Sequence, residues 1–263
     1  MQLLRTLTVN KFNQAIINGV QDDVVATEVA VALVYNGISH AVMMVTPKDL
    51  EYFAIGFTLS ENIIESVNDI YGIDIEENDN GITINIELST RRFMALKQKR
   101  RNLVGRTGCG ICGREQLNEV YQSLTGLPLT IQIVLDDFQQ SLSLLKSVQL
   151  VGAETGCTHA AVWLDDKGHF IAGFEDIGRH VALDKLLGFR AKQQQQQGVI
   201  IVSSRASYEM VQKAAKCGVE IMFAVSAATS LAVEAAQQCG LTLIGFFKGD
   251  KGVIYSGEHR IKA

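Results

Sequence analysis

The carboxyl-terminal part of the chain alternates short apolar runs with amphipathic segments, and this alternation restricts the possible folds more than any other feature. The runs 198–203, 219–225 and 241–247 have the composition of buried strands. The segments between them, 208–217 and 231–239, have helical spacing, and each precedes a glycine. Strands and helices joined by such short links form a parallel sheet with right-handed crossovers. We therefore expect an α/β domain here.

The amino-terminal part has a different pattern. Residues 27–45 and 71–88 each indicate a hairpin, with turns at Asn36-Gly37 and at Asn80-Gly81. Between the hairpins we expect a helix that runs to about residue 62. Thr46 is the expected cap of this helix, with Pro47 in its first turn and Asp49 completing a capping box.

These patterns divide the 263 residues into two predicted domains. Residues 1–124 form a smaller α+β domain that ends in a basic segment and a cysteine pair. Residues 125–263 form the α/β domain, which also contains a hairpin made by 160–164 and 170–174. The glutamine run 193–197 is predicted to be an exposed loop.

Composition excludes several classes of protein. A formal net charge of -4 and a pI near 5.8 give no support for broad nucleic-acid binding. We find no secretory signal at the start and no apolar stretch of roughly 18 residues, so we expect a cytoplasmic protein without a membrane span. Five cysteines are an odd count, which favours free thiols over a disulfide framework.

Two of these cysteines lie in the segment Gly108-Cys109-Gly110-Ile111-Cys112-Gly113, at the end of a basic stretch. Residues 91–114 contain eight Lys or Arg and no Asp or Glu. A solvated helical face would explain such a run by itself. However, the flanking glycines predict a mobile loop before a helix at 114–124, and the helix N-terminus together with Arg106 and Arg114 favours a thiolate. A mobile, ionised cysteine suits sulfur relay.

A cysteine pair with this spacing is also compatible with metal binding or a redox disulfide. A structural zinc site needs two more ligands, and Cys157 and His159 are the available candidates. Cys217 and Cys239 instead precede helix-ending glycines in apolar patterns, so we expect both to be small buried side chains.

A second candidate site lies in the loops after the parallel strands, which meet at the carboxyl edge of the sheet. Their hydroxyl and cationic groups, with the helix N-termini, suit a phosphate, and Asp250 suits an amino-bearing base such as guanine. Helix capping alone also explains the Ser and Thr residues. The candidate binding residues in these loops are Ser204, Arg205, Ser226, Thr229, Lys248, Gly249, Asp250 and Lys251.

A third cluster is expected where the 160–164 and 170–174 strands end. His159, Asp176, Arg179 and His180 could orient a substrate, carry protons or bind a metal there. A histidine beside a strand can equally be a structural residue. We count His180 among the candidate cofactor-binding residues.

Taken together, these motifs resemble the FdhD family of formate dehydrogenase accessory sulfurtransferases, over nearly the whole chain. Besides the cysteine segment, the resemblance is carried by four stretches: Thr155-Gly156 to His159-Ala160-Ala161, Glu175-Asp176-Ile177-Gly178-Arg179-His180, Ala182-Leu183-Asp184-Lys185, and Ser204 to Glu209 with Ser226-Ala227.

The resemblance implies that persulfide sulfur passes from a cysteine desulfurase to the molybdenum bis(guanine dinucleotide) cofactor of formate dehydrogenase. Cys109 is then the persulfide carrier and Cys112 its helper, and the cofactor contact falls on Phe246, Phe247 and the residues to Lys251. The cofactor is a bound substrate, and neither a permanent cofactor nor a resident metal is expected. The formate dehydrogenase catalytic subunit is an implied partner, and a homodimer is implied.

The resemblance also implies a cytidine-deaminase-like three-layer α/β/α domain. Deamination is not predicted, because the His-x-Glu of that metal signature is missing and Ala161 stands where its Glu would be. The sequence departs from the family at Asn62 and Cys157, and the second leaves a role open for an additional thiol. Two other functions stay open: a cofactor chaperone without sulfur chemistry, and a zinc protein.

Overall fold

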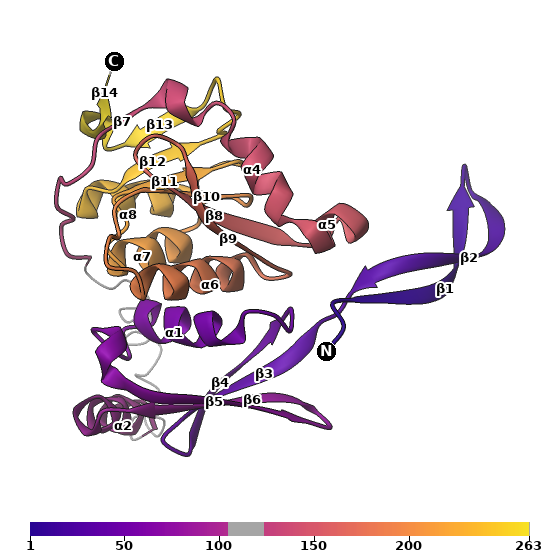
Figure 1. The fold of residues 1–263 in the computed structure, drawn as a ribbon, viewed down its shortest axis with the longest axis horizontal. Coiled ribbons are helices and arrows are strands. Elements are labelled where there is room, and N and C mark those ends of the chain that lie inside the picture. The colour runs from indigo at the N-terminus through magenta and orange to yellow at the C-terminus, as the bar shows by residue number, and fades with distance from the viewer. Residues whose placement is uncertain (105–123, 263) are drawn as a thin grey trace.

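The computed structural model describes residues 1–104 and 124–262. Its architecture is mixed α/β, as the sequence predicts. Two sheets lie on either side of a central layer of helices, and a long two-stranded ribbon projects from one end (Figure 1). Within the described residues, no helix has the length and apolar character needed to cross a membrane.

The larger sheet has six strands in the order β13-β12-β11-β10-β8-β9. The predicted parallel strands β10, β11 and β12 are at its centre, and antiparallel strands flank them on both sides. The sheet is therefore mixed, with a parallel centre. The strand bounds are β8 His159–Leu164, β9 Phe170–Asp176, β10 Val199–Val202, β11 Ile221–Ala224, β12 Thr242–Gly245 and β13 Val253–Ser256.

Helices cover both faces of this sheet, which gives the expected three layers. The helices α6 (Arg179–Ala191), α7 (Tyr208–Lys216) and α8 (Ser230–Cys239) pack on the face that carries Trp163 and Met222. The opposite face packs against the short helix α4 (Ser141–Val148) and the 3-10 turn η2 (Leu135–Phe138). Alternate residues of each central strand enter the two cores, as expected of strands buried on both faces.

The smaller sheet has the order β4-β3-β6-β5 and comes from the amino-terminal part. Both predicted hairpins are present in it, β3 (Val29–Tyr35) with β4 (Ile38–Val45) and β5 (Ile70–Asn78) with β6 (Gly81–Leu88). Asn36 and Gly37 have φ values of 45° and 80°, so the first turn is of the primed kind that the sequence predicts.

Two helices belong to this smaller sheet, α1 (Leu50–Ser60) and α2 (Thr90–Val104). The predicted start of α1 was wrong by several residues. Its N-cap is Asp49, in the left-handed region at φ 56°, and no side chain caps the helix. Thr46 lies outside the helix, where its amide donates to Asp176 Oδ2 at 3.0 Å. A long-range contact thus replaces the local cap.

The two halves meet where α1 crosses α6 (Figure 1). Gly56 of α1 and Gly188 of α6 face the backbone of the opposite helix, and a Cβ on either would overlap a carbonyl there, Asp184 O or Tyr52 O. Beside this crossing, Lys213 of α7 donates to Asp184 and to Ser60 of α1. The interface is therefore both tightly packed and tied by a buried ion pair.

The projecting ribbon, β1 (Leu4–Asn13) with β2 (Ile16–Ala26), was not predicted. It belongs to neither larger sheet. The remaining elements are short: η1 (Val67–Asp69), α5 (Leu150–Thr155), η3 (Glu258–Arg260), and β7 (Ile133–Val134), which pairs with β14 (Ile261–Lys262).

Candidate functional site

The candidate site is the edge of the six-stranded sheet at which the parallel strands end. The loops after β10, β11 and β12 emerge there because the three strands run in the same direction. β8 runs antiparallel to β10 and pairs with β9, so His159 and Asp176 face each other at the same edge. All the loops that carry predicted site residues, within the described residues, therefore meet at one edge.

Backbone hydrogen bonds join these loops into one surface. Ala206 donates to Ala227 O at 3.0 Å, and Thr229 donates back to Ala206 O at 3.0 Å. Phe246, from the loop after β12, donates to Ser226 O at 2.9 Å. The relative positions of the loops are therefore fixed by main-chain contacts and do not depend on a ligand.

The segment 246–251 is a tight loop with exposed charges. Its ends are joined by a bond from Lys248 N to Lys251 O of 2.8 Å, and Gly249 has a φ of 89°. A side chain at Gly249 would also meet Gln139 O, so glycine is required there. Asp250 and both lysines are exposed. The loop thus presents one anionic and two cationic groups to an incoming ligand.

The two phenylalanines at the start of this loop have different environments. Phe246 is 47% exposed and has a φ of 52°, which is unusual for a bulky residue. Phe247 is buried, with its ring centroid 4.8 Å from that of Phe223. Phe246 is therefore the ring available to a ligand, whereas Phe247 anchors the loop in the core.

The other predicted residues of these loops differ in exposure and in the hydrogen bonds they already make. Arg205, Ser226 and Thr229 are exposed. Ser204 is buried and donates to Arg205 O at 2.9 Å, and Thr229 caps α8 by accepting from Ala232 N at 3.3 Å. For Thr229 the capping explanation is confirmed, and a ligand contact stays a prediction.

Several polar atoms at this edge are buried without a hydrogen-bond partner among the described residues. They are Arg179 Nε, His180 Nε2 and Ser207 Oγ, which lie at the start of α6 and just before α7. His180 Nε2 is 2.8 Å from Glu209 Oε2 but lacks hydrogen-bond geometry. Because buried polar groups are normally paired, this concentration indicates a place where a ligand supplies partners.

Two histidines at this edge are held neutral near pH 7. Burial, with the charge of Arg179 as a second cause, lowers the pKa of His159 and of His180 from the ordinary 6.5. His159 Nδ1 is 3.4 Å from Ser203 Oγ, which accepts from Ala160 N at 2.9 Å. Neutral rings can accept as well as donate a hydrogen bond.

Asp176, a predicted member of the third cluster, has a structural environment. It is fully buried, and Lys185 Nζ lies 2.7 Å from its Oδ2. Its other oxygen accepts from Gly178 N at 2.9 Å. With these partners and Thr46, Asp176 joins the sheet edge to the amino-terminal half. The adjoining Arg179 and His180 are therefore held in position.

The cysteines differ in accessibility. Cys109 and Cys112, with Arg106 and Arg114, lie outside the described residues. Burial raises the pKa of the Cys217 thiol to about 12 and also raises that of Cys239. Both thiols are therefore protonated near pH 7. Cys239 is buried, as the sequence predicts, whereas Cys217 is only partly buried. Cys157 is exposed, with Sγ 3.1 Å from Thr155 Oγ1.

The zinc hypothesis rests partly on residues that the structure does not describe. Among those it describes, no group of three or more His, Cys, Asp or Glu side chains could hold a metal ion. Cys157 and His159 alone do not make a site.

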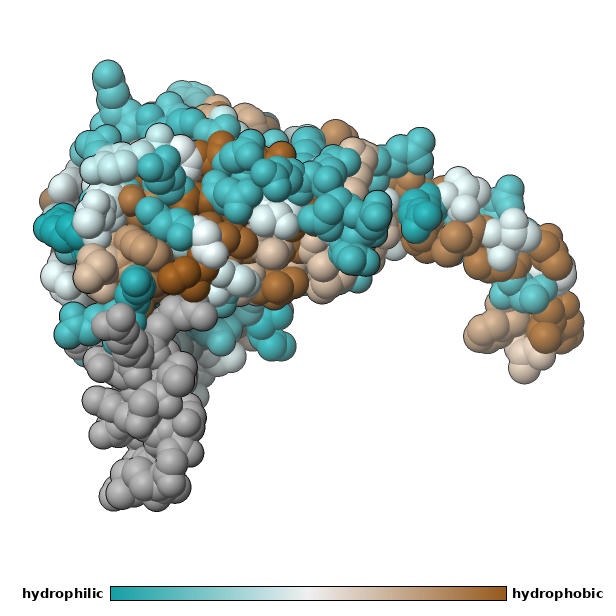
Figure 2. Space-filling view, turned by 90° about the horizontal axis from the view of Figure 1, so that it is seen from below, coloured by the Kyte–Doolittle hydropathy of each residue, from teal (hydrophilic) through white to brown (hydrophobic). Residues whose placement is uncertain are grey.

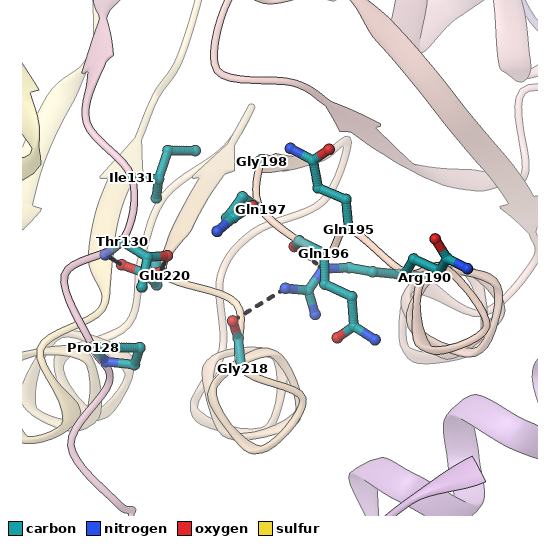
Figure 3. A pocket seen from close by; sticks show the side chains of 11 residues that line it. Pro128, Thr130, Ile131, Arg190, Gln195, Gln196, Gln197, Gly198, Gly218 and Glu220 are labelled. Carbon is teal, nitrogen blue, oxygen red and sulfur yellow. Dashed lines mark hydrogen bonds between the residues drawn. The ribbon is translucent and has the colours of Figure 1, made fainter. Parts of the chain in front are cut away.

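A cavity of about 440 Å³ lies at the opposite edge of the sheet (Figure 3). Its charged groups are already used by the fold. Arg190 donates to Gln196 O at 2.8 Å and to Gly218 O at 3.2 Å. Glu220 accepts from Thr130 N at 2.9 Å and from Arg260 Nε at 3.0 Å. Because these groups stabilise loops, we assign the cavity no ligand.

Two further residues hold groups of this region in place and are not predicted from the sequence. Glu209 faces His180, and Lys213 forms a buried ion pair with Asp184. Lys213 lies one helical turn after Met210, on the apolar side of α7, and this spacing is the sequence signal that its side chain is buried. Sequence alone gave no indication of its buried partner Asp184.

Comparison with known proteins identifies relatives of this chain. The model of the FdhD/NarQ family matches residues 26–262. The fold is also similar to the crystal structure of a protein from Desulfotalea psychrophila described as a formate dehydrogenase accessory protein. The TM-score is 0.78 at 20% sequence identity, and the similarity covers 99% of this chain and 100% of the other.

Proposed function

This chain belongs to the FdhD/NarQ family, and on that basis we propose that it is a sulfurtransferase that serves the maturation of formate dehydrogenase. It receives persulfide sulfur from a cysteine desulfurase and passes it to the molybdenum bis(guanine dinucleotide) cofactor. The observation that carries the proposal is the convergence of exposed cations and unpartnered polar atoms at the carboxyl edge of the sheet. Such an edge is where α/β sheets bind nucleotides.

The first step is thiol–persulfide exchange on Cys109. Its thiolate attacks the outer sulfur of the desulfurase persulfide, so one S–S bond forms on Cys109 as the desulfurase S–S bond breaks. The desulfurase leaves as a thiolate, and no net oxidation occurs. Arg106 and Arg114 flank the pair in sequence and favour its anionic forms.

Delivery requires the cofactor to be held while sulfur arrives. Lys248, Lys251 and Arg205 are exposed cations that suit its phosphates, and Asp250 suits the amino group of guanine. Phe246 offers an exposed ring for stacking. Cys112 is the proposed helper at this step: its thiolate attacks the Sγ atom of Cys109, so a Cys109–Cys112 disulfide forms as the persulfide S–S bond breaks, and the sulfur leaves at the sulfide level for the cofactor. The partners are thus the desulfurase, the cofactor and the catalytic subunit of formate dehydrogenase, and the proposed location is the cytoplasm.

The test is maturation of formate dehydrogenase in cells that lack this protein. Cys109→Ala is expected to abolish enzyme activity, because no sulfur can be carried. Cys157→Ala is the matched control, since it removes an exposed thiol from the same domain as the cofactor loops, and activity should persist. If Cys109→Ala restored activity, the alternative of a cofactor chaperone without sulfur chemistry would replace this proposal.

A further inference from the structure

The starts of α6 and α7 carry a group of polar side chains that the cofactor contacts proposed above do not use. His180, in the first turn of α6, has its Nε2 atom 2.8 Å from Oε2 of Glu209, in the first turn of α7. Arg179 precedes His180 in the same turn. Arg179 Nε and His180 Nε2 have no hydrogen-bond partner among the described residues. We call Arg179, His180 and Glu209 the helix-start cluster.

The helix-start cluster combines hydrogen-bond donors with acceptors. Arg179 can only donate and Glu209 can only accept, whereas the neutral ring of His180 can do both. The side chain of Glu209 is 62% exposed, so a ligand can reach its carboxylate. This carboxylate would repel a phosphate, because both groups are anions. The cluster therefore suits an uncharged ring that carries both N–H groups and acceptor atoms.

The surface at the cluster is polar, unlike that of the ribbon formed by β1 and β2. Figure 2 shows apolar atoms along the outer part of this ribbon, where Phe12 is 75% exposed and Ile17 is 71% exposed. The first turns of α6 and α7 expose no large apolar side chain. A ligand at the cluster is therefore recognised through hydrogen bonds.

The cluster and the loop 246–251 lie at different positions along the edge of the six-stranded sheet. The loop follows β12, whereas Arg179 follows β9, four strand spacings away in the order β12-β11-β10-β8-β9. Since neighbouring strands are about 4.8 Å apart, the two positions are separated by roughly 19 Å along the edge. The exposed residues Arg205 and Ser226 follow β10 and β11, which lie between them. An extended ligand can therefore contact all three regions.

We propose that the helix-start cluster binds the pterin ring of the cofactor while the loop 246–251 binds its guanine. Because the ligand is the guanine dinucleotide cofactor, this role rests on the proposed function. In this cofactor a diphosphate joins the pterin to the guanosine, so each end needs a ring site and the middle needs a cation. The two ring sites, with the exposed Arg205 between them, meet this requirement in the order that the sheet gives.

Each of the two ring sites has one exposed carboxylate. Guanine and pterin share a 2-amino-4-oxopyrimidine edge, whose N–H groups donate to a carboxylate. Asp250 offers this carboxylate in the loop 246–251, and Glu209 offers it in the helix-start cluster. Arg179 supplies a donor for the acceptor atoms of the pterin. The two sites thus recognise the same edge on two different ring systems.

The pterin carries the metal through its two dithiolene sulfur atoms, so the position of the pterin also places the metal. α6 and α7 pack on one face of the sheet, and α6 crosses α1 of the amino-terminal half. The loop 246–251 instead approaches Gln139, at the end of η2 on the other face. The cofactor therefore crosses the strand ends from one face to the other. Its metal end lies toward the half of the chain whose sequence includes Cys109.

The test measures binding of neopterin, a fluorescent pterin without a phosphate, to the full-length protein by fluorescence polarisation. Guanosine diphosphate is added at a saturating concentration to fill the guanine site, and we expect the wild type to bind both molecules together. Glu209→Gln should weaken neopterin binding by roughly 10- to 100-fold through loss of a charge-assisted contact. Its affinity for guanosine diphosphate, measured by calorimetry, should be unchanged. Asp250→Asn should show the opposite pattern, and Glu234→Gln, an exposed glutamate of α8, is the control that should bind both normally.

Three results would each overturn the pterin site: no neopterin binding to the wild type, displacement of neopterin by guanosine diphosphate, or equal neopterin affinity of the wild type and Glu209→Gln. Loss of guanosine diphosphate affinity in Glu209→Gln would place the guanine at the cluster and overturn it as well. Loading of Cys109 with sulfur by a desulfurase needs neither ring site, so Glu209→Gln should still be loaded. A wild type that takes up no sulfur would contradict the proposed sulfur transfer but not the pterin site. Fluorescence of Trp163, the single tryptophan, verifies that the variants are folded.

Discussion

Lys213 Nζ lies 3.0 Å from Asp184 Oδ2 at the junction of the two halves of the molecule, and both side chains are buried. Asp184 also accepts from Ser60 Oγ at 2.8 Å, and Lys213 lies 2.9 Å from Glu61 Oε1. Although burial opposes the charge, the carboxylates of Asp184 and Glu61 raise the pKa of Lys213 overall. The pair therefore connects α1 to α6 and α7.

Lys213→Met should reduce the free energy of unfolding by about 3–5 kcal/mol, because it leaves the Asp184 carboxylate buried without its cation. Urea unfolding followed by Trp163 fluorescence measures this change. The matched control is Lys192→Met, which breaks the exposed pair with Glu51 and should cost less than about 1 kcal/mol. Equal effects of the two substitutions would show that the buried pair does not stabilise the junction.

Gly188→Ala should also destabilise the protein, by about 1–3 kcal/mol or more, because its methyl group would overlap Tyr52 O of α1. Gly126→Ala is the control, since no atom lies near its Cβ position. The same urea titration compares them. If Gly188→Ala were as stable as Gly126→Ala, the close contact between α1 and α6 would not require glycine at position 188.

Stability should fall as pH decreases from about 7 through the range below 6.5. The pKa values of His159 and His180 are lowered in the folded state, so the unfolded chain binds more protons in this range and acid favours unfolding. The variant His159→Gln/His180→Gln should show a smaller decrease than the wild type, as measured by urea unfolding at several pH values. An unchanged pH dependence would contradict the assignment of neutral rings.

Arg205→Gln and Lys248→Gln should each weaken binding of guanosine diphosphate, the probe for the cofactor's nucleotide, by roughly 10- to 100-fold through loss of a charge-assisted contact. Isothermal titration calorimetry measures the affinity. Lys167→Gln, in the turn at the other end of β8, serves as the control and should bind normally. Normal affinity in both site variants would place the nucleotide elsewhere.

The sequence predicted those parts of the fold that have strong periodicity. Asn36-Gly37 identified a primed turn, and the apolar runs before Ser203 and Phe246 identified parallel strands whose ends meet. The projecting ribbon was missed because its turn places Gln14 and Ala15 at positive φ, where neither residue is usual, so no turn signal was present. The start of α1 was misplaced because Asp176, distant in sequence, bonds Thr46.

In the candidate site, too, the features set by a local sequence pattern were predicted and those set by long-range contacts were not. Strand order determines which loops meet, and strand order follows from the alternation of strands and helices. The pairing of Lys213 with Asp184, by contrast, depends on how two helices cross, which no local pattern encodes. Buried charge pairs such as this one, at the junction of the two halves, are therefore the part of the structure that a single sequence predicts least well.

Sulfur transfer through Cys109 can be tested by mass spectrometry of the protein after incubation with a cysteine desulfurase and cysteine. We expect the added mass of one sulfur atom on the peptide that contains Cys109. This mass should be lost on treatment with a thiol reductant and should be missing in Cys109→Ala. The Cys157 peptide should stay unmodified. Sulfur found only on Cys157, or on no cysteine at all, would contradict the claim that Cys109 carries sulfur.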